Sequence, residues 1–508
     1  MSTTLFRNAL VVAMDDVNRS KPFRSDVLVV DDRITAVAPD LPVPDGAEVI
    51  DCTHRLLMPG LVNAHVHSWE ALFKGRYDNL PLELWMLLSY PILGLEPMSE
   101  RLIYLRTLLV GMESLRNGAT CLLDDVIESP TQSLTALEAV FRGYEDIGIR
   151  ANCSGNIVNR HYIDTIPFVD EMVPADLLAE ARAVAPRTTE DYLQFSKEAL
   201  TRFDGRAGRL RYVIAPSGPQ RCTDELFVAA NELSREHDTT FHVHVLETKM
   251  QAVTGREFYG STLVEYLNSL GVLTDRATLA HGIWLTDGDI ELLGAAGASV
   301  AHNPISNLKL GSGIAPWRAL LDAGVNIGLG SDGLSSNDSA RMFDVVKSAA
   351  LLHKVTQPDF DTWPTADEVL WAATRGGARS ARLTDEVGAI APGRKADLVL
   401  LDLNALNFTP VNDVAQHLVY VENGDSITEV WVNGEVVVRD RRCLHIDEDA
   451  VLAEIRELGG EYLARYAEIE QRNHALMPHF RAIYQRCCRE AMGINRFSDD
   501  ERAWVGVL

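Results

Sequence analysis

The chain is organised around the stretch Met58-Pro59-Gly60-Leu61-Val62-Asn63-Ala64-His65-Val66-His67, where an apolar run ends in two histidines separated by one residue. Alternate side chains of an extended strand point the same way, so His65 and His67 can bind one ion from one face. Imidazole nitrogens suit zinc, and two of them leave room for further ligands and a water. The pair alone is equally compatible with two hydrogen-bonded core histidines, so its meaning depends on the rest of the chain.

Strand-like and helix-like segments alternate downstream of this stretch. Apolar strand-like runs are predicted at 119–124, 149–156, 210–216, 240–246, 277–282, 297–301 and 326–331. Amphipathic helical patterns lie at 99–117, 190–203, 224–236 and 261–270. With the strand at 58–65, eight β/α units in sequence predict an α/β fold of the (β/α)8 TIM-like barrel type. An open doubly wound sheet is the structural alternative, but no GxGxxG motif opens a helix after the first strand.

The two ends of the chain both have short strand patterns. Residues 5–57 contain several short strands, and strands after Gly388 include a hairpin signal at Asn433-Gly434. Neither end has enough strand to be stable alone. We therefore predict a composite β-sandwich domain made of residues 1–57 plus 388–445, a metal-dependent catalytic barrel at 58–387, and a C-terminal helical extension at 446–508.

Composition limits the classes of partner. The 508 residues include 72 acidic and 47 basic side chains, and the formal charge of -25 repels phosphate backbones and argues against nucleic acid. Seven scattered cysteines without a CxxC pair are typical of a reduced, cytoplasmic protein. No signal peptide pattern is present, and no run of about 18 apolar residues predicts a membrane span. The extension at 446–508 could cover a subunit interface or be a solvated cap, and we expect a homodimer or higher homo-oligomer.

Polar residues end four of the eight predicted strands. Catalytic groups of such barrels lie at the C-terminal ends of the strands. The first strand ends at His65 and His67, the fifth in the segment His242-Val243-His244-Val245-Leu246-Glu247, the sixth at His281 and the eighth at Asp332. One buried histidine is usually a hydrogen-bonded core residue. Four such strand ends on one face of a barrel instead favour a metal centre.

At these positions the chain resembles the amidohydrolase superfamily, in particular its mononuclear aminohydrolases, which include S-adenosylhomocysteine and methylthioadenosine deaminases and triazine hydrolases. The resemblance extends to about residue 440 and is carried by the motifs PGLVNAHVH, HVLET, LAHGIWL, HNPISNLKLGSG and GLGSDGLSSNDSARMFDVVKSAALLHK. It implies that the metal ligands are His65, His67, His244 and Asp332, with Asp332 also holding the attacking oxygen. It implies that Glu247 carries the proton and that His281 is a second acid/base or orienting group.

The residue types fit these roles. Three neutral imidazoles, one carboxylate and a water suit Zn²⁺ or Fe²⁺. Such an ion lowers the pKa of its water to about 7, and Glu247 follows His244 closely enough to take the proton without ligating. Binuclear relatives bridge two ions with a lysine or carboxylate near the fourth strand, but Arg211–Ser217 contains neither. One divalent metal per chain is therefore expected, Zn²⁺ first and Fe²⁺ as the alternative.

The substrate contacts are less well defined by the sequence. Nucleoside deaminases of this type usually carry a histidine after the fourth strand, in a pattern like PHSPY, where this chain has Pro216-Ser217-Gly218-Pro219-Gln220. The acidic residue before the tryptophan of their LPLxEWL pattern is here Leu84, with Glu83 beside it. Both departures count against an adenosine-like substrate. By position, the candidate substrate-binding residues are Trp69, Arg76, Trp85, Gln220 and Asn303, while His242 is assigned a structural role.

We therefore predict a metal-dependent hydrolase that deaminates an aminated N-heterocycle (purine-, pterin-, pyrimidine- or triazine-like) by metal-hydroxide attack on the ring carbon. Its partners are then a small-molecule heterocycle and water. The alternatives are a triazine-type hydrolase that expels chloride or an alkylamine, and a cyclic amide hydrolase. A non-enzymatic metal-binding protein is disfavoured, because a structural zinc site needs no proton carrier such as Glu247 and usually fills all four positions with protein.

Overall fold

A computed structural model describes residues 2–128 and 132–497, and its central layer is built from eight parallel strands in two four-stranded sheets. The first sheet contains β6 (Leu61–Val66), β7 (Ala119–Asp124), β8 (Arg150–Ser154) and β9 (Leu210–Val213). The second contains β10 (Phe241–Val245), β11 (Ala277–His281), β12 (Ser299–His302) and β13 (Asn326–Leu329). Each strand overlaps one of the eight segments predicted from the sequence.

Backbone hydrogen bonds connect the two sheets on both sides. Ile214, which follows β9, pairs in parallel with Phe241 of β10. On the other side, the amide N of Asp332, after β13, donates to the carbonyl O of His65 in β6 at 2.9 Å. The strands therefore follow chain order around an α/β fold of the TIM-barrel type, and the C-terminal ends of β6 and β13 meet.

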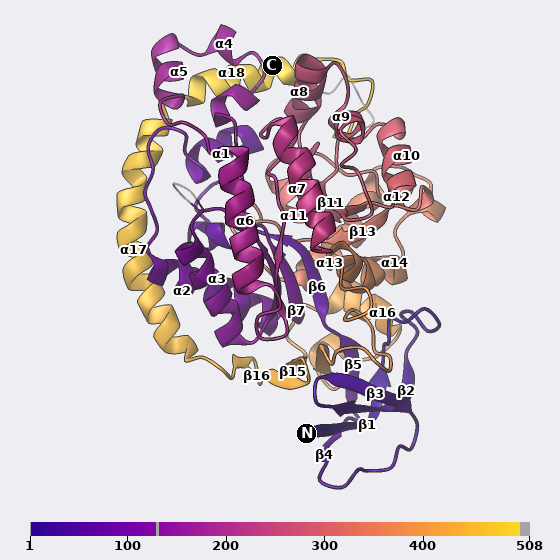
Figure 1. The fold of residues 1–508 in the computed structure, drawn as a ribbon. Coiled ribbons are helices and arrows are strands. Elements are labelled where there is room, and N and C mark those ends of the chain that lie inside the picture. Colours follow the sequence, from indigo (N-terminus) through magenta and orange to yellow (C-terminus); the bar gives the residue numbers. More distant parts are fainter. Residues whose placement is uncertain (1, 129–131, 498–508) are drawn as a thin grey trace.

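Helices follow the strands and cover the outside of this layer (Figure 1). Their starts are encoded locally: Thr188 and Asp191 form a capping box before one helix, and Thr262 and Glu265 form another. A capping box satisfies two N–H groups that the helix leaves unpaired. The helices of the barrel layer include α2 (Glu100–Arg116), α3 (Leu134–Ile147), α6 (Thr189–Phe203), α7 (Asp224–Glu236), α8 (Lys249–Tyr259), α9 (Leu263–Ser269), α10 (Asp287–Ala296), α12 (Trp317–Asp322) and α13 (Met342–Leu352).

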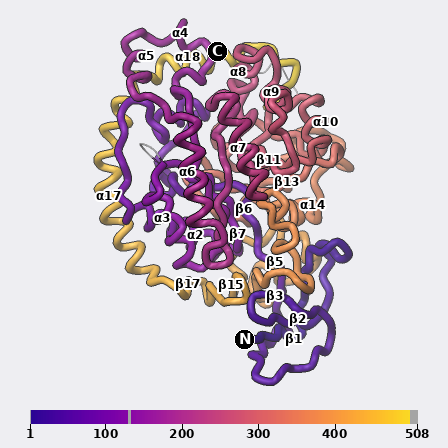
Figure 2. Tube along the Cα trace, viewed as in Figure 1, coloured from indigo at the N-terminus to yellow at the C-terminus, as the bar shows by residue number. Residues whose placement is uncertain are grey.

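The two ends of the chain share a second sheet of nine strands. The N-terminal strands are β1 (Thr3–Val11), β2 (Phe23–Val30), β3 (Arg33–Ala38), β4 (Glu48–Asp51) and β5 (Arg55–Pro59). The C-terminal strands are β14 (Leu398–Asp402), β15 (Ile427–Val432), β16 (Glu435–Arg439) and β17 (Arg442–Cys443). Strand β5 pairs antiparallel with β14, so segments from opposite ends of the sequence lie side by side (Figure 2).

An apolar cluster of its own stabilises this second sheet. Phe6, Leu57, Leu398 and Trp431 are among its buried members, and the rings of Phe6 and Trp431 meet edge to face at 5.2 Å. The turn between β15 and β16 is the predicted one: Asn433 and Gly434 have φ angles of 53° and 76°. Positive φ at both central residues is what a two-residue type I′ hairpin requires. The chain therefore has an extra β-rich unit beside its barrel-type layer.

The stretch 58–65 is not one strand, as predicted, but two. Strand β5 ends at Pro59, where Met58 and Pro59 pair with β14, and β6 begins at Leu61. A Cβ at Gly60 would lie 2.0 Å from Oγ1 of Thr120, which favours glycine between the two strands. The two sheets are therefore joined directly through this one residue.

The C-terminal segment is helical, as predicted, with α17 (Glu448–Asn473) and α18 (Met477–Arg489). Helix α17 packs on α2, and α18 packs on α1 (Leu82–Ser89) and α8, at the end of the molecule opposite β1–β5 (Figure 1). The part of the predicted extension at 498–508 lies outside the described residues. Among the described helices, none is long and apolar enough to cross a membrane.

Candidate active site

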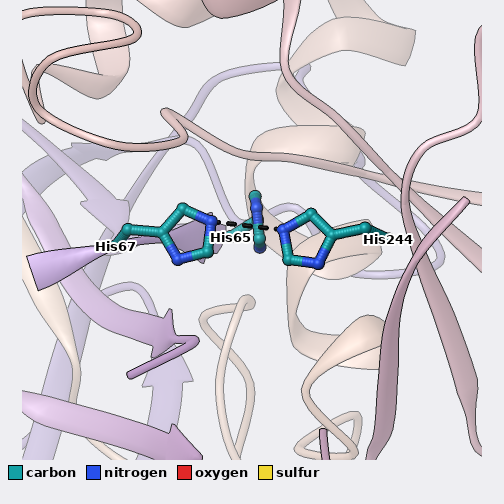
Figure 3. Close-up of side chains that lie close together, drawn as sticks. All are labelled: His65, His67 and His244. Atoms are coloured by element: carbon teal, nitrogen blue, oxygen red, sulfur yellow. Dashed lines mark hydrogen bonds between the residues drawn. The ribbon is translucent and has the colours of Figure 1, made fainter. Parts of the chain in front are cut away.

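The side chains predicted as metal ligands converge at the C-terminal ends of β6, β10 and β13. His65 lies in β6 and His67 just after it, His244 lies in β10, and Asp332 follows β13. One ligand atom from each of His65, His67 and His244 lies within 4.8 Å of the other two. His65, His281 and Asp332 form a second such group within the same limit. Figure 3 shows the imidazoles of His67 and His244 facing each other, with His65 between them.

The facing nitrogens of His67 and His244 indicate room for a cation. Their Nε2 atoms are 3.2 Å apart, while their Nδ1 atoms lie 2.8 Å and 3.0 Å from the carbonyl oxygens of Asp125 and Ser217. A carbonyl oxygen only accepts, so each Nδ1 carries the proton and each Nε2 presents a lone pair. Two lone pairs at this separation repel each other unless a cation lies between them. Two nitrogens that bind one tetrahedral zinc at about 2.1 Å would be roughly 3.4 Å apart.

The remaining donor atoms of the cluster also lack protein partners. Nε2 of His65 is buried with no hydrogen-bond partner among the described residues, and it lies 3.4 Å from Oδ1 of Asp332. The same Oδ1 is 3.6 Å from Nε2 of His67, while Oδ2 of Asp332 accepts a hydrogen bond from Oγ of Ser306 at 2.5 Å. A buried polar atom without a partner is costly, so a metal ion or a water bound there would satisfy it. Three imidazole nitrogens and one carboxylate oxygen fit a zinc ion.

Burial favours the neutral imidazole at two of the three histidines, His65 and His244. Desolvation lowers the pKa of His65 to about 4. It lowers the pKa of His244 well below the ordinary value, and the neighbouring His65 and His67 lower it further. A metal binds only the neutral imidazole, so these shifts favour metal binding at neutral pH.

His242 belongs to the site, although the sequence analysis gave it only a structural role. It precedes His244 by two residues in β10, so both side chains point to the same face of the strand. Nε2 of His242 lies 2.8 Å from Nδ1 of His65, and the two rings stack at 4.9 Å. When Nε2 of His65 faces a cation, its Nδ1 carries the proton and donates to His242. The H-x-H spacing in β10 was the signal that could have revealed this contact.

Glu70 is a second residue that the sequence analysis missed. It lies in a short 3-10 helix (Ser68–Phe73), and its Oε2 accepts from the amide N and the hydroxyl of Ser335 at 3.0 and 2.8 Å. The same atom accepts from the amide N of Ser336 at 3.1 Å, and Oε1 accepts from the hydroxyl of Tyr90 at 2.7 Å. The carboxylate thereby ties the segment after β6 to the loop that follows Asp332. No short motif predicts a contact across such a distance in sequence.

Glu247 and His281 face each other beside the cluster. Oε2 of Glu247 is 3.6 Å from Nε2 of His281, and the Nδ1 of His281 is 3.0 Å from Oδ1 of Asn307. The backbone N of Glu247 donates to Oε1 of Gln251 at 3.0 Å. Burial raises the pKa of Glu247 well above its ordinary value, and the charge of Asp332 raises it further. A raised pKa makes the carboxylate a stronger base, which suits it to take up a proton and pass it on.

A cavity of about 40 Å³ opens onto these side chains. Glu247, His281 and Asp332 form part of its wall, and Trp85 and Arg221 are also among its lining residues. The histidine cluster, the carboxyl of Glu247 and this cavity are therefore contiguous. Polar groups converging on one pocket are typical of an active site.

The five candidate substrate residues fall in different places. Trp85 lines this cavity, Gln220 lines an adjacent one, and Nδ2 of Asn303 is 3.3 Å from Nδ1 of His281. Trp69 and Arg76 are not among the described lining residues of either cavity. Trp69 is buried, and its Nε1 donates to a backbone oxygen at 3.3 Å; Arg76 is paired with a glutamate of α17. The structure thus brings three of the five candidates to the site region and places two in packing and ion-pair contacts.

Fold and site together define a TIM-barrel-type protein with a histidine-rich centre, able to hold a metal, at the C-terminal ends of its strands. The chain belongs to the amidohydrolase family, whose profile matches residues 56–437. The resemblance inferred from the motifs is thereby confirmed.

Similar proteins cover nearly the whole chain. The chain is 33% identical over 469 residues to 5'-deoxyadenosine deaminase of Methanosarcina mazei, and the match covers 92% of this chain and 99% of the relative. It is 34% identical over 455 residues to 5-methylthioadenosine/S-adenosylhomocysteine deaminase of Desulforudis audaxviator, and this match covers 88% of this chain and 96% of the relative. The crystal structure of an adenosine deaminase from Xanthomonas campestris with bound zinc superposes with a TM-score of 0.80 at 28% identity, covering 91% of this chain and 99% of that one.

Proposed function

We propose that this protein is a metal-dependent aminohydrolase that replaces the amino group of an aminated N-heterocycle by oxygen. The observation that carries the proposal is the pair of facing Nε2 atoms of His67 and His244, 3.2 Å apart, beside the buried carboxyl of Glu247. The named deaminases among the relatives support the same reaction class. In this proposal His65, His67, His244 and Asp332 hold one divalent ion per chain, with Zn²⁺ as the first candidate and Fe²⁺ as the second.

Such an ion would supply Lewis-acid chemistry that lowers the pKa of a water at the site. Glu247 accepts a proton from the attacking water and delivers it to the leaving amino group, which departs as ammonia. His281, oriented by the contact between its Nδ1 and Asn307, uses Nε2 to accept a hydrogen bond from the attacking oxygen. Oδ2 of Asp332 accepts a hydrogen bond from Oγ of Ser306, and this contact fixes the direction in which Oδ1 points. The net change is water plus ring C–NH2 giving ring C–OH and ammonia.

Aminopurine nucleosides are the first substrates to test, because the relatives are named as deaminases of adenosine derivatives. The experiment measures ammonia release from aminated purines, pterins, pyrimidines and triazines with zinc-loaded protein, and chloride release from a chlorotriazine in parallel. Ammonia from at least one amino compound, lost in His244→Ala, is the expected result. Chloride or alkylamine release without ammonia would instead favour triazine-type hydrolysis. A dihydropyrimidine is included in the panel, and opening of its ring would favour a cyclic amide hydrolase.

We further propose that the eight strands close into a barrel at 58–387 and that residues 1–57 plus 388–445 form one composite β-sandwich domain. The pairing of β5 with β14 and the backbone contacts of Ile214 and Asp332 support this division. The extension at 446–508 is proposed as a separate element in a homodimer or higher homo-oligomer. Sedimentation of the zinc-loaded protein tests the assembly, and a monomer at micromolar concentration would contradict it.

A further inference from the structure

The cavity that opens onto the candidate active site is smaller than the substrates proposed above require. Its volume is about 40 Å³, room for a few water molecules at most, whereas pockets that bind small organic molecules usually measure about 300–1,000 Å³. The side chains of the site are correspondingly buried: His67, His244, Glu247 and Asp332 are each no more than 6% exposed. Part of the wall must therefore move before a heterocycle can enter.

Helix α1 is the part of the wall best placed to move. Its residues Leu82, Trp85 and Met86 line the cavity, whereas the proposed metal ligands lie at the ends of hydrogen-bonded strands. The stretches 74–81 and 90–99 on either side of α1 contain no regular helix or strand. Nε1 of Trp85 is buried and has no hydrogen-bond partner among the described residues. A bound heterocycle with an acceptor nitrogen would satisfy this N–H group and so favour the position of α1 seen here.

The C-terminal extension holds the chain just before α1. Arg76 donates to both carboxylate oxygens of Glu470 in α17, at 2.7 and 2.6 Å. The hydroxyl of Tyr77 donates to Oε1 of the same carboxylate at 2.6 Å. These three hydrogen bonds attach the chain to α17, and two of them join opposite charges, which makes them stronger than neutral ones.

Helix α17 makes a second attachment just after α1. Oδ1 of Asn473 accepts from the amide N atoms of Ile92 and Leu93, both at 2.9 Å, and its Nδ2 donates to the carbonyl O of Leu93 at 2.8 Å. Glu470 and Asn473 are three residues apart, so they lie on the same face of α17. We call residues 78–91, which lie between the two attachments and contain α1, the roof segment.

The extension also packs against α1 itself. The hydroxyl of Tyr466 in α17 donates to the carbonyl O of Leu88 at 2.9 Å. Leu84 and Leu87 share an apolar cluster with Ile483 of α18, and this cluster is separate from the main core of the molecule. Movement of α1 away from the cavity therefore breaks contacts with the extension and leaves the main core in place.

We propose that the roof segment is a movable cover of the active site and that the C-terminal extension sets how readily it opens. Opening breaks no strand pairing, so the proposed metal ligands keep their positions. Glu470 and Asn473 act through α1 and are positioning residues. The inference rests on the proposed function in one respect, because it is a heterocyclic substrate that needs the entrance. It gives α17 and α18 a role in the reaction besides any role in subunit contact.

Hydrogen exchange of the zinc-loaded protein tests the proposal in the absence of substrate. We expect the amides of the roof segment to exchange faster than those of α2, although α1 and most of α2 are buried. Glu470→Ala removes the attachment before α1, so exchange in the roof segment should become at least about 10-fold faster, the ratio that one charge-assisted hydrogen bond supplies. Glu470→Gln retains an acceptor oxygen and should give an intermediate rate. Glu468→Ala, at an exposed glutamate of the same helix, should have no effect.

Removal of zinc by excess 1,10-phenanthroline gives a second measurement. The chelator reaches the ion when the roof segment is open, so removal should be faster in Glu470→Ala by a similar factor and unchanged in Glu468→Ala. Three results would each overturn the proposal: unchanged exchange of the roof segment in Glu470→Ala, an equal increase of exchange in α2 and the strands, or an unchanged rate of zinc removal. Neither measurement needs turnover, so both effects in a protein that releases no ammonia would refute the deaminase and retain the movable roof segment.

Discussion

Nε2 of His242 lies 2.8 Å from Nδ1 of His65, and this contact sets the direction in which His65 offers its other nitrogen. The two residues come from β10 and β6, strands of different sheets, and both are fully buried. Histidines that bind metals commonly donate their second N–H to a neighbouring acceptor, which fixes the tautomer. Here the acceptor is another imidazole. His242 thus acts through His65 and is a positioning residue.

Replacement of His242 should therefore weaken metal binding without removing a proposed ligand. His242→Leu cannot accept the hydrogen bond from His65, and the zinc affinity should fall by roughly 10–100-fold. His242→Gln retains an acceptor oxygen and should lose less. Competition with a chromophoric chelator measures both affinities. Wild-type zinc affinity in His242→Leu would show that the contact has no influence on the site.

Glu247→Gln should separate chemistry from metal binding. The amide keeps the shape of the side chain but cannot transfer a proton, so kcat for ammonia release should fall by roughly 10²–10⁴-fold. The protein should still contain about one metal per chain, because Glu247 is not a proposed ligand. His244→Ala should lose metal and activity together. Loss of metal from Glu247→Gln, or near wild-type ammonia release, would contradict the assigned role.

A pair of glycine substitutions tests whether the hairpin of β15 and β16 is stabilised by its contact with the N-terminal strands. Gly434 and Gly393 both have positive φ, 76° and 91°, so alanine at either site costs about 1 kcal/mol in backbone strain. A Cβ at Gly434 would lie 2.0 Å from the backbone oxygen of Asp31, whereas one at Gly393 meets nothing within 4 Å. Gly434→Ala should therefore lower Tm clearly more than Gly393→Ala. Equal effects would mean that the hairpin of β15 and β16 does not depend on its contact with the N-terminal strands.

Acid should destabilise the protein partly through His353. This side chain is buried, with its Nε2 3.2 Å from that of His302, and burial lowers its pKa to about 3. In the unfolded chain the pKa is about 6.5, so between these values the unfolded state binds a proton that the folded state does not. The free energy of unfolding therefore falls as pH decreases, by roughly 2 kcal/mol at pH 5 from this residue.

His353→Gln removes this titration. The guanidinium chloride concentration at the midpoint of unfolding should decrease less between pH 7 and pH 5 in this variant than in the wild type, because the variant has no His353 to protonate. His302 and the proposed metal ligands are common to both proteins, so their titration does not affect the comparison. Zinc is kept in excess in both experiments. Identical pH dependence would show that His353 does not contribute to acid sensitivity.

Sequence periodicity was sufficient to locate the strands and the side chains at their ends. His65, His67, His244, His281, Glu247 and Asp332 converge because parallel strands in chain order bring their C-terminal ends together. The division of the stretch 58–65 at Gly60 was missed, because an apolar run looks the same whether it lies in one sheet or crosses between two. The close approach of Thr120, which sequence does not reveal, requires glycine between the two strands.

Contacts between distant segments account for the other differences between the predicted site and the structure. Arg76 looked available for substrate, but its guanidinium pairs with Glu470 of α17, an element whose position the sequence did not specify. Glu70 was overlooked because an isolated glutamate has no periodic signal. Its importance follows from what surrounds it, the hydroxyls of Tyr90 and Ser335.

The central claim is that one metal, held by His65, His67, His244 and Asp332, supports deamination of a heterocyclic amine. The most direct test is a zinc titration of metal-free protein, with ammonia release from the best amino substrate measured at each addition. We expect a linear rise in activity that stops at about one zinc per chain, and no activity at any loading in His244→Ala. A break at two zinc ions per chain, or full ammonia release without added metal, would contradict it.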